Sequence, residues 1–390
     1  MSNTDWSKKY NYNFPTSIRF GKGVIEELGD HLKAEAVKRT LLVTDSGLFK
    51  LPVFKKIQDI LEKNKIAVTP FYDLHKNPVK SDVKKGVDAY KLNKCDNIVG
   101  LGGGAAMDVA RAIALWANHP ENDLFDFDDA KGGDKFVTNP IPYFVTVPTT
   151  SGTGSEVGRS TVISDDDTHA KKILFSPKLL AKKVFADPEL TMELPAFITA
   201  ATGLDALTHN LEAYIAQGVS PLCEGIALEG IRLIFDSLQT ATKNPDLESR
   251  AKMQMAALMG ATAFQKGLGV VHSLAHPLST VFDMHHGLAN AIMLNHGMEF
   301  NLSVCEEKFM RIMSYLGLRA KSGEEFISYL NAFNLKLNMP TTLKGHVTAW
   351  TEKEKNRLYD LAVEDPCHAS NPRPVTRADF IKLYEHAYHA

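Results

Sequence analysis

The two halves of this 390-residue chain carry different hydrophobic patterns. Up to about residue 190, short runs rich in β-branched residues alternate with stretches whose apolar residues recur at helical spacing. This alternation is typical of βαβ units, in which helices cover a mostly parallel sheet. After residue 190 the pattern is helical, and almost no strand signal remains. The strand-like runs are 40–45, 66–73, 97–104, 143–150 and 160–165, and the clearest helical stretches are 52–64, 81–93, 221–240 and 249–265.

The patterns predict two domains. The chain length favours the same division, because a single hydrophobic core stops growing beyond about 250–300 residues and this chain has 390. We expect an α/β domain with a mostly parallel sheet at residues 1–190 and an all-helical domain at residues 191–390. Pro188 and Pro195 interrupt the chain near this boundary.

The charge and hydrophobic composition of the chain limit the kinds of partner that it can bind. The formal net charge is −2, with 44 Lys and Arg against 46 Asp and Glu, and no basic stripe stands out. This balance argues against nucleic acid or an anionic membrane as the main partner. No apolar run reaches membrane-spanning length and the N-terminal segment has no signal-peptide pattern, so we expect a cytoplasmic protein. The four cysteines have no paired spacing, which predicts free thiols.

Three consecutive glycines, Gly102, Gly103 and Gly104, follow an apolar run and precede a strong helical stretch. A strand, a glycine turn and a helix together point backbone N–H groups and the positive helix end at a phosphate, so they favour a nucleotide pyrophosphate. The run is not the usual GxGxxG fingerprint. Taken alone, a tight turn between strand and helix explains it equally well.

A second cluster of hydroxyls and glycines, residues 149–155, follows the strand-like run that begins at residue 143. Ligands of open α/β sheets bind at the carboxyl ends of the strands. Thr149, Thr150 and Thr153 are therefore candidates to hold ribose, phosphate or the nicotinamide amide. Two turns of this kind in one sheet favour nucleotide binding more than either turn does alone.

Asp45 stands at the end of the run 40–45. A carboxylate at a strand end accepts hydrogen bonds from ribose hydroxyls and repels a 2′-phosphate, which favours NAD over NADP. An aspartate that only begins a turn is equally common. Both interpretations stay open on the residues alone.

Four side chains have the spacing of a metal site: Asp205, His209, His272 and His286. Asp205 and His209 are four residues apart and share one face of a helix. An isolated pair of this kind is more often structural. However, residues 272–296 contain five histidines, and histidine is rarely used so densely in packing. One carboxylate and three imidazoles suit Fe(II) or Zn(II) and leave positions for substrate or water, so the pattern predicts a catalytic metal site.

The sequence resembles the iron-containing, or group III, alcohol dehydrogenase family along nearly its whole length. The likeness rests on several separate segments that are jointly specific. They are FGKG at 20–23, GGG-x-x-x-D at 102–108, VPTTSGTGSEV at 147–157, DPELTMELP at 187–195, GLDALTHNLEAY at 203–214, HSLAHPL at 272–278, HHGLANA at 285–291 and NPR at 371–373.

The resemblance implies an N-terminal NAD(P)-binding α/β domain, a C-terminal all-helical domain and a metal in the cleft between them. It implies oxidation of small primary alcohols or diols to aldehydes or ketones by hydride transfer to NAD, in a homodimer or larger homo-oligomer. It also implies that His276 lies beside the nicotinamide and substrate, where Pro277 disfavours regular helix. Because an imidazole titrates near neutral pH and can relay the substrate proton, His276 is the candidate proton carrier, with His285 as a second candidate. It assigns the metal to Asp205, His209, His272 and His286, and cofactor contacts to Asp45, Gly102, Gly103, Gly104, Asp108, Thr149, Thr150 and Thr153.

Three other functions stay open. A hydroxyacid dehydrogenase would use the same site with a different substrate pocket. A dehydroquinate-synthase-like lyase would also use NAD and a metal, but its phosphate-bearing substrate requires basic residues in the cleft. Lys266 is the nearest basic residue to the histidine segments. A non-catalytic nucleotide-binding protein would have no use for the four metal ligands. The residues do not separate Fe(II) from Zn(II), since both accept this donor set.

Overall fold

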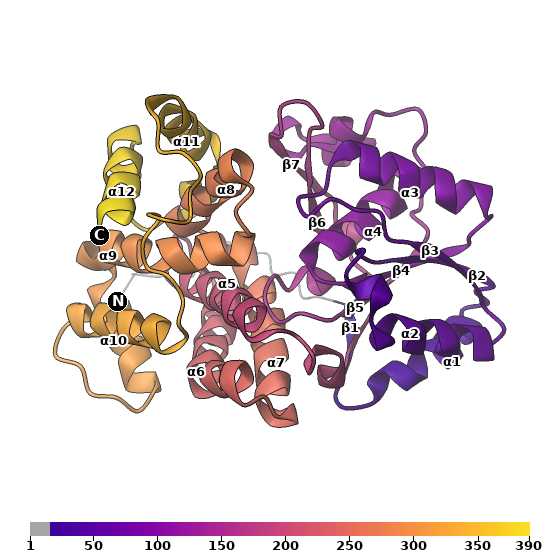
Figure 1. Ribbon diagram of the computed structural model, residues 1–390, viewed down its shortest axis with the longest axis horizontal. Helices are drawn as coiled ribbons and strands as arrows, with labels where there is room; N and C mark the ends of the chain where they lie inside the picture. The colour runs from indigo at the N-terminus through magenta and orange to yellow at the C-terminus, as the bar shows by residue number, and fades with distance from the viewer. Residues whose placement is uncertain (1–15) are drawn as a thin grey trace. The chain divides into compact units, whose positions relative to one another are not determined.

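The computed structural model describes residues 16–390, and these form two compact units (Figure 1). The α/β unit comprises residues 16–199 and 244–254, and the helical unit comprises residues 200–243 and 255–390. The later segment joins the α/β unit through hydrogen bonds. Arg250 donates to Thr199 Oγ1 at 2.8 Å and to the carbonyl of Leu194 at 3.0 Å. The α/β unit is thus built from two separate stretches of chain, whereas the sequence predicts a single domain boundary at residue 190.

The α/β unit contains a six-stranded parallel sheet in the order β1-β8-β5-β4-β2-β3. Because parallel strands need crossover connections, helices separate most of the strands in sequence. The predicted fold class, a mostly parallel α/β domain followed by helices, is confirmed. The strands are β1 Ser17–Phe20, β2 Arg39–Val43, β3 Ala67–Phe71, β4 Asn97–Gly102, β5 Tyr143–Pro148 and β8 Lys183–Ala186.

Helices cover both faces of this sheet (Figure 1). On one face, α3 and α4 bury apolar residues against alternate strand positions such as Leu41 and Val43. On the other face, α1 and α2 pack against the positions between them, such as Leu42. Both faces are therefore apolar, which explains why these strands read as continuous hydrophobic runs. The helices are α1 Leu28–Ala34, α2 Pro52–Lys63, α3 Lys80–Leu92 and α4 Gly104–Ala117.

The predicted strand at 160–165 does not join the parallel sheet. It forms β6, Ser160–Ser164, which pairs antiparallel with β7, Lys171–Phe175. The intervening residues are too few for a crossover helix, so the two strands close as a hairpin. The prediction of a strand was right, and its placement in the parallel sheet was wrong.

The helical unit has no strand among its described residues. Pro277 lies inside α8 and does not end it, contrary to the expectation from sequence. Proline removes one backbone hydrogen bond, but the helix continues past Pro277 to Phe282. The helices from residue 196 onward, of which residues 196–199 and 247–254 belong to the α/β unit, are α5 Ala196–Ile215, α6 Pro221–Lys243, α7 Leu247–Ala263, α8 Val270–Phe282, α9 His286–Tyr315, α10 Gly323–Lys336, α11 Glu352–Glu364 and α12 Arg377–His389.

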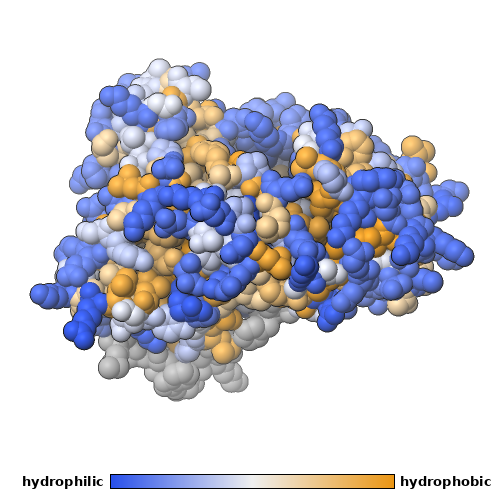
Figure 2. Space-filling model, turned by 60° about the horizontal axis from the view of Figure 1, so that its bottom comes forward, coloured by the Kyte–Doolittle hydropathy of each residue, from blue (hydrophilic) through white to orange (hydrophobic). Residues whose placement is uncertain are grey.

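Surface properties agree with the composition. Within residues 16–390, none of the helices combines the length and apolar character needed to cross a bilayer. The face in Figure 2 is mostly hydrophilic, with smaller hydrophobic patches between the polar side chains. All four cysteines are free, as their spacing predicts.

Candidate functional site

Four side chains of the helical unit converge on one point. Asp205 and His209 lie one turn apart on α5, His272 lies on α8, and His286 begins α9. One oxygen or nitrogen from each lies within 4.8 Å of the corresponding atoms of the others. The rings of His209 and His272 stack with centroids 4.7 Å apart. This spacing allows one divalent cation to contact all four groups.

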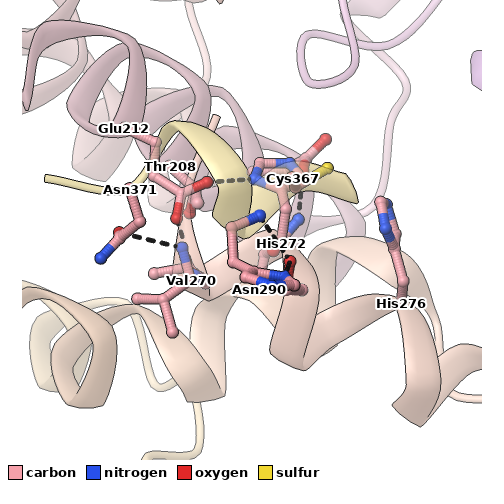
Figure 3. Close-up of polar contacts among 12 residues, drawn as sticks. Thr208, Glu212, Val270, His272, His276, Asn290, Cys367 and Asn371 are labelled. Atoms are coloured by element: carbon pink, nitrogen blue, oxygen red, sulfur yellow. Dashed lines mark hydrogen bonds and ion pairs between the residues drawn. The ribbon is translucent and has the colours of Figure 1, made fainter. Parts of the chain in front are cut away.

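Glu212 determines which nitrogen of His272 faces the other three groups (Figure 3). Its Oε2 lies 2.6 Å from His272 Nδ1, and its Oε1 accepts the backbone N–H of Val271 at 2.6 Å. Because an ionised carboxylate only accepts, Nδ1 carries the proton and Nε2 keeps its lone pair. Nε2 is buried and has no hydrogen-bond partner among the described residues. That arrangement fits an imidazole whose natural partner is a metal ion.

Asn371 holds the first turn of the same helix from the other side (Figure 3). Its Oδ1 accepts from the backbone N–H of Val270 at 3.1 Å and from Asn301 Nδ2 at 3.0 Å. Gly269 makes room for this contact, since a Cβ there would lie 2.8 Å from both Asn371 Oδ1 and Glu212 Oε1. The start of α8, and with it His272, is therefore fixed by two buried side chains.

Asp205 is buried and ionised. Burial opposes its charge, but the nearby His209 and His286 outweigh burial and hold the pKa of the carboxyl far below its usual value. Asn290, one turn after His286 on α9, donates from Nδ2 to Asp205 Oδ1 at 2.7 Å. This amide ties the helix that carries His286 to the carboxylate on α5.

His276 lies beside the four ligand candidates. It is one turn beyond His272 on α8, and its ring stacks on that of His286 with centroids 5.3 Å apart. Its Nδ1 lies 2.7 Å from Asp365 Oδ2. Burial opposes ionisation of Asp365, but His276 outweighs it and holds the pKa of that carboxyl well below its usual value. The role of His276 as a proton carrier stays a prediction.

The glycine turn of the α/β unit packs against the threonine cluster. Gly103 caps the N-terminus of α4 and Gly104 is its first residue. A Cβ on Gly103 would lie 3.2 Å from Thr150 Cγ2, and one on Gly104 would lie 2.8 Å from Thr153 Cγ2. Glycine therefore permits close packing at a helix start, where backbone N–H groups are available to a phosphate.

Asp45 stands at the same edge of the sheet. Its Oδ1 accepts the backbone N–H groups of Gly47 and Leu48, both at 2.9 Å, so this aspartate does begin a turn. Its Oδ2 would lie 3.8 Å from a Cβ on Gly102. Thr149 reaches this glycine too, since its backbone N–H donates to the Gly102 carbonyl at 3.0 Å. The carboxylate thus begins a turn and adjoins the glycine turn, and its contact with a ribose stays a prediction.

Asp108 is engaged inside the α/β unit. Its Oδ1 accepts from Ser155 Oγ at 2.7 Å and its Oδ2 from the backbone N–H of Val162 at 3.1 Å. Arg111 lies 3.2 Å away on the same helix. Burial raises the pKa of this carboxyl. Asp108 fastens α4 to Ser155 at the end of the threonine cluster and to Val162 of β6, and its direct contact with a pyrophosphate stays a prediction.

Family models and known proteins match the chain along its length. The model described as iron-containing alcohol dehydrogenase matches residues 15–188, and the C-terminal model of the Fe-containing alcohol dehydrogenase family matches residues 199–388. This chain belongs to the iron-containing alcohol dehydrogenase family. It is therefore an oxidoreductase that acts on alcohols, and the predicted resemblance is confirmed.

Individual relatives extend over almost the whole chain. A 4-hydroxybutyrate dehydrogenase of Cupriavidus necator is 34% identical over 381 residues, which are 95% of this chain and 97% of the relative. An NAD-dependent methanol dehydrogenase of Bacillus methanolicus is 32% identical, covering 97% and 99%. The crystal structure of a 1,3-propanediol oxidoreductase has a TM-score of 0.92 at 33% identity and covers 98% and 100%.

Glu212→Gln should weaken metal binding about ten-fold, because a neutral amide no longer fixes the proton on His272 Nδ1 or strengthens the imidazole as a ligand. The measurement is a chelator competition with Zn(II) on the purified dehydrogenase. Glu224→Gln is the matched control: Glu224 binds Lys266 at 2.7 Å in the same unit, and within residues 16–390 none of its hydrogen bonds or ion pairs joins the four ligand candidates. Equal affinities in the Glu212 variant and the wild type would contradict the assignment.

Gly104→Ala should weaken NAD binding about ten-fold. Its new Cβ would lie 2.8 Å from Thr153 Cγ2, and overpacking of this kind costs about 1–3 kcal/mol. Adding Thr153→Ser removes that methyl group and should restore most of the affinity, measured by calorimetric titration. A single variant that binds NAD as the wild type does would show that the turn is not the pyrophosphate site.

Sequence reasoning missed the residues that hold the ligand candidates in place. Asn290 lies four residues after His286, so helical spacing alone could have indicated it, whereas Glu212 lies 60 residues from its partner His272. Asp365 lies 89 residues from His276 in the chain, and no local pattern connects them. Asn371 is the first residue of the NPR segment, which resembles the family but whose pattern alone assigns no role to Asn371.

Proposed function

We propose that this chain is a metal-dependent, NAD-linked dehydrogenase that interconverts small primary alcohols or diols with the corresponding aldehydes or ketones. The observation that carries the proposal is the convergence of one carboxylate and three imidazoles, with His272 Nε2 directed by Glu212. The helical unit would hold the metal and the α/β unit would hold NAD.

The donor set fits Fe(II), and it accepts Zn(II) equally well. Three nitrogen ligands and one oxygen ligand from the protein leave positions for a substrate oxygen. A divalent cation bound there supplies Lewis-acid stabilisation of that oxygen, which favours loss of the hydroxyl proton. Asp205 offsets part of the cation charge, and Glu212 keeps the His272 lone pair on the metal side.

NAD is the proposed hydride acceptor. The glycine turn at Gly102, Gly103 and Gly104 would receive the pyrophosphate, with hydroxyls from Thr149, Thr150 and Thr153 nearby. Asp45 adjoins that turn, and its charge would repel a 2′-phosphate, so NAD is preferred over NADP. The relative from Bacillus methanolicus is named as NAD-dependent, which supports this preference.

His276 is the proposed carrier of the substrate proton. It stands next to the ligand candidates without belonging to them, and imidazole exchanges protons near neutral pH. Its Nδ1 meets Asp365, so Nε2 is the nitrogen proposed to take the hydroxyl proton. In the reverse direction the same nitrogen would return the proton to the carbonyl oxygen.

A phosphate-bearing substrate is disfavoured. Lys266, the basic residue nearest the histidine segments in sequence, is buried with its Nζ 2.7 Å from Glu224 and 3.1 Å from the carbonyl of Tyr214. Its charge is already balanced, so it does not serve a substrate phosphate. The relatives are named for small alcohols, a diol and a hydroxyacid, which supports a small substrate. We further propose a cytoplasmic homodimer or larger homo-oligomer.

The test combines metal analysis with a substrate panel. Purified protein loaded with Fe(II) or Zn(II) is assayed with NAD and with NADP against short primary alcohols, 1,2- and 1,3-diols and 4-hydroxybutyrate. We expect about one metal ion per chain and NADH formation with at least one small alcohol. Preference for 4-hydroxybutyrate would favour the hydroxyacid alternative. Metal-loaded, NAD-binding protein that oxidises nothing in the panel would contradict the proposal.

A further inference from the structure

A carboxylate far away in sequence is fastened to His276. Asp365 lies directly before the short helix η10, Pro366–Ser370, and its Oδ2 lies 2.7 Å from His276 Nδ1 on α8. Both side chains are largely buried, with 17% and 10% of their surfaces exposed. A short hydrogen bond between partly desolvated groups holds its geometry better than a surface contact does.

Asp365 is itself held in place by further hydrogen bonds. Its Oδ1 accepts from Ser273 Oγ at 2.7 Å and from the backbone N–H of Cys367 at 2.9 Å. Ser273 Oγ in turn accepts the backbone N–H of His368 at 2.9 Å. The network joins two turns of α8 to η10, so the carboxylate has a fixed orientation before it meets the imidazole.

Two imidazoles of α8 are bound in the same way. His272 Nδ1 meets Glu212 at 2.6 Å, and His276 Nδ1 meets Asp365 at 2.7 Å. In each pair the carboxylate accepts the Nδ1 proton, and the lone pair remains on Nε2. The two rings are one helical turn apart, with centroids 5.7 Å apart.

We propose that Asp365 is a positioning residue that fixes the ring of His276 in the tautomer with its lone pair on Nε2. This inference rests on the proposed proton transfer through His276. An imidazole with the opposite tautomer presents an N–H where a proton must be accepted. Loss of the carboxylate therefore lowers turnover through His276 and leaves the four ligand candidates unchanged.

The same side chains could also be imagined as ligands of a second ion, because donor atoms of His276, Asp365 and Cys367 lie within 4.8 Å of one another. The hydrogen bonds favour positioning. Asp365 uses Oδ2 for the imidazole and Oδ1 for two other donors, and a cation would have to displace the Nδ1 proton.

The kinetic test is a double-mutant cycle. Asp365→Asn keeps the size of the side chain and, through Oδ1, the contacts with Ser273 and Cys367, but it can place an N–H donor against His276 Nδ1. We expect kcat to fall about ten- to a hundred-fold with metal content unchanged, as for other residues that orient a catalytic or ligating imidazole. In the His276→Ala background the same substitution should have almost no further effect, since its action passes through the imidazole.

Asp246→Asn is the matched control. Asp246 also uses a carboxylate to accept a backbone N–H, that of Ser249 at 2.7 Å, and it lies in the α/β unit. Its variant should keep the wild-type kcat. A merely structural role for Asp365 would give the same loss of kcat with and without His276. That result, or an unchanged kcat in Asp365→Asn, would overturn the proposal.

A spectroscopic readout separates this inference from the proposed function. In Zn(II)-loaded protein labelled with ¹⁵N-histidine, the ring shifts of His276 should report a protonated Nδ1 in the wild type and a protonated Nε2 in Asp365→Asn. If His276→Ala leaves turnover intact, the proton-relay role fails while the tautomer measurement still decides whether Asp365 positions the ring. The same tautomer in both proteins, or a second metal equivalent that disappears with Asp365→Asn, would overturn positioning.

Discussion

Asp205→Asn and His209→Ala should each yield folded protein with no retained metal and no measurable turnover. Either change removes one of only two donors that α5 contributes to the four converging groups. Asparagine keeps the shape of the side chain but not the charge, so the Asp205 variant tests the electrostatic contribution of the carboxylate. The measurement is metal per chain by mass spectrometry after gel filtration, with circular dichroism as the check on folding.

His296→Ala is the control for loss of a histidine from the same segment. His296 is buried on α9 and its Nε2 contacts the carbonyl of Thr341 at 3.2 Å, away from the four ligand candidates. We expect this variant to keep its metal, whatever its effect on stability. A full equivalent of tightly held metal in Asp205→Asn would mean that the cation binds elsewhere.

The fold could be predicted because its strongest signals are local. The strands of the sheet are buried on both faces, so they stand out as apolar runs, and the helices between them keep a regular spacing. The short edge strand β1 and strand β8 have four residues each and carry too little pattern to be recognised. The position of β6 was wrong because pairing with β7 depends on the connection between them, which apolar runs do not reveal.

The site residues also differ in how well the sequence reveals them. The four ligand candidates attract notice through residue type and spacing, since an Asp and a His four apart must share a helix face. Their supporting carboxylates do not, because Glu212 and Asp365 are separated from their histidines by 60 and 89 residues. Acidic side chains are common, so only the folded chain shows which of them meet an imidazole. Sequence thus indicates the chemistry of the donors, and the structure indicates how their protons are arranged.

His276→Ala should lower kcat about a hundred-fold while bound metal and NAD affinity stay close to the wild-type values. The reason is that a positioned general acid or base contributes about 10²–10⁴ in rate, whereas His276 lies outside the four ligand candidates. Added imidazole should restore part of the activity, because the lost group is small and acts by moving a proton. Thr280→Ala is the control, since Thr280 lies one turn further on α8 and its hydroxyl donates to the backbone carbonyl of His276 at 3.2 Å, not to the imidazole. Loss of metal in His276→Ala would make it a ligand, and a hundred-fold loss in kcat that imidazole cannot relieve would point to a packing role.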